Sequence, residues 1–131
     1  MLVLNMRKRW ISWPEAGVRL LLSPLTNIRR AELMEQATVD KVDPENPKRK
    51  PVPTFNQRTY QDLVADECVH GWEGMLQPES EEADAALVPL PYGRPAAREA
   101  MAIDHFNVFV FNTAQTMGLE VQKGDKAAGN G

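Results

Sequence analysis

The ten prolines of this 131-residue chain constrain its fold more than any other feature. Four of them fall in residues 38–54, and a second group lies in residues 78–95. Proline at such density forbids a helix and removes the donors that a strand needs. We therefore expect residues 38–54 to be a mobile loop or linker. Within the second group, residues 80–87 contain no proline and can form a short helix that Pro89 and Pro91 end.

Length and composition predict one small domain with a short tail. The chain is 43% hydrophobic and 25% charged, which suits a folded protein of this length. We expect residues 1–118 to form the domain and residues 119–131 a disordered tail, because the tail is rich in glycine and charge. A single cysteine excludes an internal disulfide. No apolar run approaches the roughly 20 residues that span a bilayer, and these features predict a soluble protein of a reducing cytoplasm.

The first third of the chain predicts a hairpin followed by a helix. Residues 7–13 alternate weakly, Pro14-Glu15-Ala16-Gly17 has good turn chemistry, and residues 18–22 have the composition of a strand. A helix then begins at Ser23-Pro24, with Thr26 as an alternative N-cap.

Two further helices are expected downstream. One begins at Phe55 or Asn56 and ends at Gly71, because an apolar stripe recurs at helical spacing. Its members are Tyr60, Leu63, Val64, Cys68 and Trp72. The other runs from Pro95 to Gly118 and is apolar on more than one face after Phe106. It is either the central core helix or a surface for a partner or a second copy. The predicted fold class is α+β, mainly helical, with an N-terminal β-hairpin packed with three main helices and long Pro-rich loops.

The residues predict no catalytic, cofactor-binding or metal site. Cys68 and His70 would point apart on a helix, and His105 is the only other histidine. The chain lacks a phosphate-binding glycine loop and a nucleophile elbow, so we expect it not to be an enzyme. Two basic runs, Arg7-Lys8-Arg9-Trp10 and Lys48-Arg49-Lys50, could contact nucleic acid, but the isoelectric point near 5.4 opposes a dedicated binder.

Charge is unevenly distributed along the chain. The first fifty residues are net basic and the remainder is net acidic. Such a distribution can promote head-to-tail contacts between copies, or it can be ordinary solvated surface.

A series of short motifs resembles the tail assembly chaperones of long-tailed bacteriophages. It comprises Gly17-Val18-Arg19-Leu20-Leu21-Leu22-Ser23-Pro24-Leu25-Thr26, then His70-Gly71-Trp72-Glu73-Gly74-Met75, an acidic segment, Leu90-Pro91-Tyr92 and a last helix. The resemblance covers residues 17–118. One departure is Gln77-Pro78-Glu79-Ser80, which stands where the family usually has an Asp/Asn-Gly turn.

The resemblance implies a non-enzymatic role in the host cytoplasm. Such chaperones bind the helical tape-measure protein, keep it soluble and help to recruit tail-tube subunits, and many have a longer, frameshifted form. The partner contacts that we expect are Trp72, Met75, Phe106, Phe109 and Phe111. Each of these could instead pack within the chain. Two other functions stay open: a structural phage component, such as a head–tail connector or tail-completion protein, and a small nucleic-acid-binding regulator.

Overall fold

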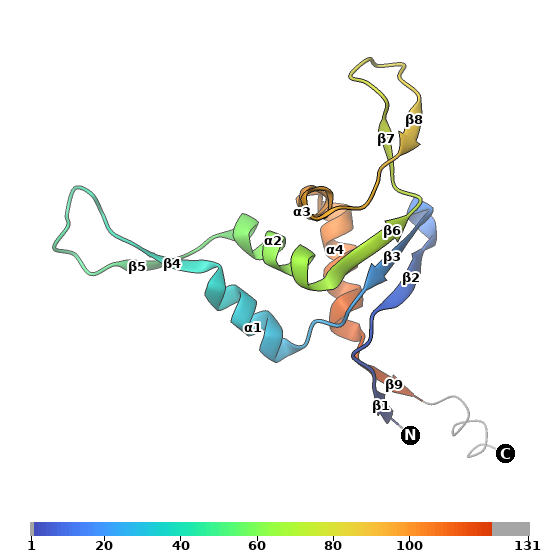
Figure 1. Cartoon of the computed structure of the whole chain (residues 1–131). Helices are drawn as coiled ribbons and strands as arrows, with labels where there is room; N and C mark the ends of the chain where they lie inside the picture. Colours follow the sequence, from blue (N-terminus) through green and yellow to red (C-terminus); the bar gives the residue numbers. More distant parts are fainter. Residues whose placement is uncertain (1, 122–131) are drawn as a thin grey trace.

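The computed structural model describes residues 2–121, which contain nine strands beside four α-helices (Figure 1). The prediction of a mainly helical protein is therefore wrong, although the α+β composition stands. In chain order the elements are β1 (Leu2–Leu4), β2 (Arg9–Trp13), a short 3₁₀ turn (Pro14–Ala16), β3 (Val18–Leu22), α1 (Asn27–Gln36), β4 (Thr38–Lys41), β5 (Val52–Phe55), α2 (Gln57–Cys68), β6 (Val69–Glu73), β7 (Leu76–Pro78), β8 (Leu87–Pro89), α3 (Arg94–Met101), α4 (Asp104–Thr116) and β9 (Leu119–Val121).

An antiparallel sheet in the order β2-β3-β6 forms the centre of the molecule. The β2–β3 hairpin lies where the sequence predicts it, and Gly17 closes its turn with a φ of 69°. Alternate residues of β3 point into the core, and the helices cover that face of the sheet (Figure 1). The opposite face carries Arg19, which pairs with Glu73 of β6.

Polar caps begin two of the helices as the sequence indicates. The hydroxyl of Thr26 accepts a hydrogen bond from the Arg29 amide at 3.1 Å, so the alternative cap is the correct one for α1. The Asn56 side chain accepts from the Thr59 amide at 2.9 Å and begins α2. Adjacent carboxylates of α2 then bind two different helices: Asp66 pairs with Arg98 of α3, and Glu67 with Arg29 of α1.

The helix predicted to continue to Gly71 ends earlier. Helix α2 stops at Cys68, and the next residue is already in β6, which pairs with β3. Trp72 therefore lies on a strand opposite Leu20, not on the helical stripe. Sheet pairing with a strand some fifty residues away overrides the local helical periodicity, as tertiary context commonly does.

The predicted last helix is two helices, α3 and α4, separated by Ala102 and Ile103. The side-chain amide of Asn107 donates to the Met101 carbonyl at 3.0 Å and so satisfies a carbonyl left free at the end of α3. Asp104 then occupies the first turn of α4, where a negative charge is favourable. The break rotates the faces of α4 relative to those of α3.

Three two-stranded antiparallel ribbons lie partly in segments that were predicted to be loops or tail. Strands β4 and β5 pair at the ends of residues 38–54, and β9 pairs with β1. The helix predicted for residues 80–87 is wrong, because β7 pairs with β8 and the residues between them form bends and turns. Residues 122–131 of the predicted tail lie outside the described part of the chain. Prolines are tolerated here because both strands of such a ribbon are edge strands, so a missing N–H faces away from the partner strand.

Candidate partner-binding surface

An apolar groove follows the outer side of α4. Its lining residues enclose about 490 Å³: Trp13, Asp104, His105, Val108, Phe109 and Asn112. Trp13, at the end of β2, stacks on Phe109 with ring centroids 4.5 Å apart and planes 5° from parallel. Val108 is 55% exposed, which is unusual for a valine beside two aromatic rings. The groove is thus lined by both apolar and polar side chains.

The helical period of α4 explains why this face is open. Phe106, Val110 and Ala114 recur every four residues and are buried against the sheet and α3. Val108 is offset from Phe106 by about 200° around the helix, so it points away from the core. Val108 is left exposed on the outside of α4, next to the half-buried Phe109.

A second groove includes a residue of the α3–α4 junction. It encloses about 290 Å³ and is lined by Met75, Leu76, Gln77, Leu90, Ala96, Glu99, Ala100 and Ile103. Ile103 is 61% exposed, and Leu76 is 53% exposed. Ile103 of this groove and Asp104 of the first are consecutive in the chain, and we call the residues that line the two grooves the α3–α4 surface. Apolar surfaces of this kind accept the apolar stripe of a partner helix.

The predicted contact residues divide between this surface and the core. Phe109 and Met75 line the two grooves. Trp72 and Phe106 are only 8% and 4% exposed, so in this conformation they offer a partner almost no surface. Phe111 packs on Tyr60 with ring centroids 5.5 Å apart, outside both grooves.

Trp13, Ile103 and Val108 were not anticipated from the sequence. Trp13 could have been found from its position directly before the predicted turn, where a large ring reaches over the hairpin end. Ile103 and Val108 could not be placed while residues 95–118 were taken as one continuous helix, because the break at Ala102 decides which face of α4 is outermost.

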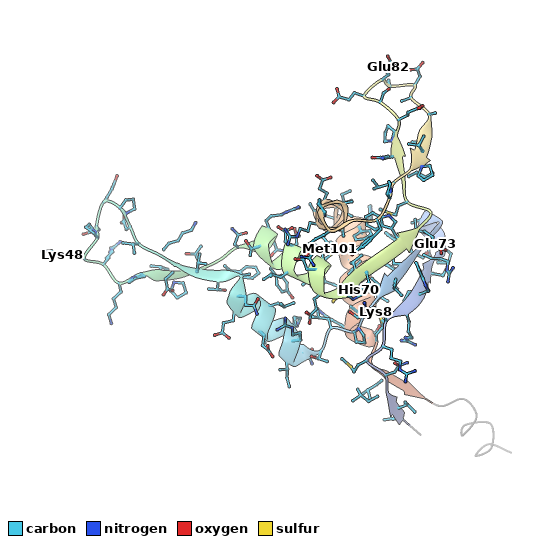
Figure 2. The ribbon with its side chains drawn as sticks, viewed as in Figure 1. Lys8, Lys48, His70, Glu73, Glu82 and Met101 are labelled. Atoms are coloured by element: carbon cyan, nitrogen blue, oxygen red, sulfur yellow. The ribbon has the colours of Figure 1, made fainter. Side chains whose placement is uncertain are left out.

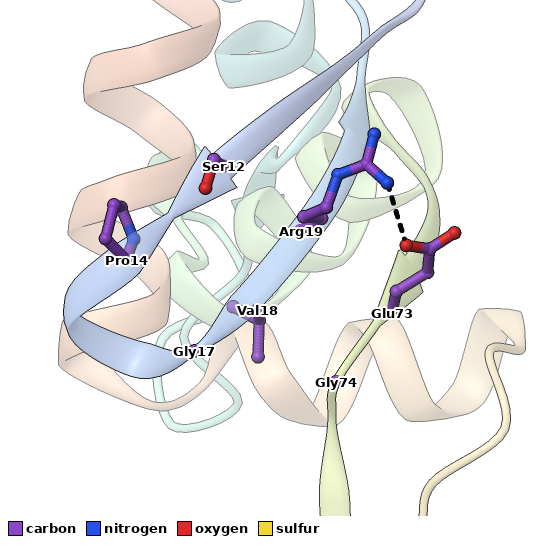
Figure 3. Close-up of a pocket in the computed structure, with 7 residues that line it drawn as sticks. All are labelled: Ser12, Pro14, Gly17, Val18, Arg19, Glu73 and Gly74. Atoms are coloured by element: carbon purple, nitrogen blue, oxygen red, sulfur yellow. Dashed lines mark hydrogen bonds and ion pairs between the residues drawn. The ribbon is translucent and has the colours of Figure 1, made fainter.

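The second glycine of the Gly71-Trp72-Glu73-Gly74 motif packs against the hairpin turn (Figure 3). Gly74 has a φ of +88°, and a Cβ placed on it would lie 2.5 Å from the Gly17 carbonyl oxygen. Beside this contact is a shallow hollow of about 300 Å³, whose charged lining residues, Arg19 and Glu73, bond to each other at 2.9 Å. The motif therefore holds the end of β6 against the β2–β3 turn, and its Glu73 is already paired with Arg19.

Ser23 and His70 are the one pair in the described chain that resembles a nucleophile and base. The Ser23 hydroxyl donates to the Glu67 carbonyl at 2.8 Å, and the same oxygen lies 2.8 Å from His70 Nε2. Since the hydroxyl has one proton and has already donated it, Nε2 must be the donor to Ser23. An imidazole in that tautomer cannot accept the serine proton, so the pair fixes the α2–β6 junction to the end of β3.

Burial changes the acid–base properties of this junction. It raises the pKa of the Cys68 thiol to about 12, so Cys68 stays protonated and packs as a small apolar residue. Burial, together with the charge of Lys8, lowers the pKa of His70 below its ordinary 6.5. Among residues 2–121 no three His, Cys, Asp or Glu side chains are grouped to hold a metal ion.

The lowered pKa of His70 predicts a specific loss of stability in acid. In the unfolded chain His70 binds a proton at higher pH than in the fold, so acidification favours unfolding. Its contribution is complete above about pH 6.5 and declines as the pH falls toward the folded pKa. His70→Gln keeps an N–H donor for Ser23 without this titration. Urea unfolding between about pH 5 and 8 should show that the free energy of unfolding falls more steeply with acidification in the wild type than in His70→Gln. Parallel curves for the two proteins would contradict the lowered pKa of His70.

None of the described helices combines the length and apolar character needed to cross a membrane. No family model, curated protein or solved structure matches the chain.

Proposed function

We propose that the protein is a non-catalytic assembly chaperone of a long-tailed bacteriophage, acting in the host cytoplasm. In this proposal its client is the tape-measure protein, an apolar helix of which lies on the α3–α4 surface. The observation that supports the proposal is the exposed Val108 beside the Trp13–Phe109 stack. The motif resemblance described above gives the identity of the client and the role in recruiting tail-tube subunits.

The composition of the surface defines the kind of helix that it would accept. Ile103 and Val108 supply exposed apolar area, and the Trp13 and Phe109 rings form a rigid wall. Glu99 and Asp104 lie among the lining residues of the two grooves. A client stripe of apolar residues at i, i+3, i+4 and i+7, flanked by Lys or Arg, matches this arrangement.

Val108→Asp should abolish client binding and leave the fold intact. The new carboxylate would stand in the apolar groove, where a bound helix would have to desolvate it. Because Val108 is 55% exposed, the free protein should keep its melting temperature within a few degrees. Co-expression with the tape-measure protein encoded by the same phage, followed by sedimentation and sizing chromatography, measures how much client stays soluble.

A matched control uses the same chemical change at a distance. Ile28→Asp alters an isoleucine that is 75% exposed on α1, outside both grooves, and it should protect the client as the wild type does. A wild-type chain that leaves the client insoluble, or a Val108→Asp chain that still protects it, would reject the proposal.

The projecting ribbons favour a structural phage component as the second candidate. Exposed leucines are found on β1, β7, β8 and β9, which is typical of subunits that interlock with neighbours. Mass spectrometry of purified particles separates the two functions, because a structural component remains in the virion and a chaperone is absent from it.

A further inference from the structure

Two of the ribbons project from the body as arms with oppositely charged tips (Figure 2). The first arm, β4 and β5, carries Lys48-Arg49-Lys50 in its connecting loop. The same loop also holds Asp43 and Glu45, so it is net basic by one charge. The second arm, β7 and β8, carries a loop with carboxylates and no cation. Those carboxylates are Glu79, Glu81, Glu82 and Asp84.

Among residues 2–121, the tip charges have no ion-pair partners. In the described chain, every ion pair involves other side chains, on the helices or the sheet. The two arms project in different directions, so Lys48 and Glu82 lie at separate extremities of the molecule (Figures 1 and 2). Pairing of these opposite charges therefore requires two molecules.

Each arm also has an exposed apolar face next to its charged tip. The register of the second arm places Leu76 opposite Pro89 and Pro78 opposite Leu87, so these four side chains share one face. On the first arm, Val39 and Val52 share a face with Lys41. Val52 is 61% exposed and Leu87 is 64% exposed. An isolated two-stranded ribbon is marginal in water, so both faces favour being covered.

We propose that the first arm of one copy lies along the second arm of the next copy. The Val39–Val52 face covers the Leu76–Leu87 face, and Lys48, Arg49 and Lys50 lie beside the carboxylates of the neighbour. The two contacting surfaces are different, so the association is head-to-tail, and it forms a ring or a filament according to the rotation between copies. This contact shares Leu76 with the α3–α4 surface, and it does not depend on the identity of the client.

Reversing the charge of each arm tests the contact directly. The first variant is Lys48→Glu/Arg49→Glu/Lys50→Glu, which makes both arms acidic. The second is Glu79→Lys/Glu81→Lys/Glu82→Lys, which makes both arms basic. Each variant alone should elute as a monomer in chromatography with light scattering. An equimolar mixture should associate again, because every acidic arm then finds a basic one.

Salt and a matched control distinguish this contact from a general charge effect. The wild type should associate in about 50 mM salt and dissociate in about 1 M salt, where charges are screened within a few ångströms. Arg7→Glu/Lys8→Glu reverses exposed cations outside the arms and should associate as the wild type does. Circular dichroism of each variant checks that the fold is retained. A wild type that is monomeric at low salt, or a mixture of the two variants that stays monomeric, overturns the proposal.

Discussion

Replacing Trp72 by alanine is expected to lower the free energy of unfolding by about 3–5 kcal/mol, the usual cost of truncating a buried tryptophan. The indole is 8% exposed and makes edge contacts with Tyr92 and Phe106, at centroid distances of 5.3 and 6.4 Å. Its Nε1–H donates to the Leu90 carbonyl at 2.8 Å. Trp72→Ala therefore removes packing between the sheet, α4 and the segment that leads into α3, and it leaves a carbonyl without its donor.

Thermal and urea unfolding followed by circular dichroism measure this loss, which should lower the melting temperature by roughly 10–20 °C. Trp72→Phe is the matched control, because it keeps a ring between Tyr92 and Phe106 and loses the hydrogen bond. The melting temperature of Trp72→Phe should lie between those of Trp72→Ala and the wild type. An unchanged melting temperature in Trp72→Ala, together with lost client binding, would instead make Trp72 a partner contact.

Gly74→Ala is expected to destabilise the fold by roughly 2–5 kcal/mol, because two costs add. A φ of +88° is unfavourable for alanine by about 1–2 kcal/mol. The added Cβ would also lie 2.5 Å from the Gly17 carbonyl oxygen, so one of the two turns must move. Overpacking against backbone typically costs about 1–3 kcal/mol more.

The neighbouring glycine provides the control for this prediction. A Cβ on Gly71 would meet Leu21 and Trp10 at 3.6 and 3.7 Å, which is ordinary contact, and its φ is not in the left-handed region. Gly71→Ala should therefore change the free energy of unfolding by less than about 1 kcal/mol. Equal urea midpoints for the two variants would show that the approach of Gly74 to Gly17 is not needed for stability.

The elements predicted correctly are those whose signals are local. The Pro14–Gly17 turn and the caps at Thr26 and Asn56 depend on a few adjacent residues, so the β2–β3 hairpin and the starts of α1 and α2 follow from the sequence. The end of α2 depends on a strand far away in the chain. Cys68 continues the helical stripe, and only pairing with β3 turns the next residues into β6.

The ribbons and the helix break could not be predicted from the sequence, for two different physical reasons. Pro53, Pro78 and Pro89 argue against strands only where both edges of a strand must pair, and a two-stranded ribbon lacks that requirement. The break before Asp104 contains no glycine or proline from which it could be predicted. It is stabilised instead by the hydrogen bond that the Asn107 side chain donates to the Met101 carbonyl. Phe109 and Met75 were placed on a partner surface from their apolar character, whereas Ile103 and Val108 required the break to be known.

The direct junction between α2 and β6 has a consequence for the relation between the two arms. No loop separates Cys68 from Val69, and the two ends of this continuous helix–strand unit lead into β5 and β7. The unit therefore acts as a spacer that sets the relative orientation of the arms (Figure 1). Each residue of an α-helix adds about 100° of rotation and 1.5 Å of length. Inserting a single residue in α2 would turn one arm relative to the other, so helix length alone could convert a closed ring into an open filament.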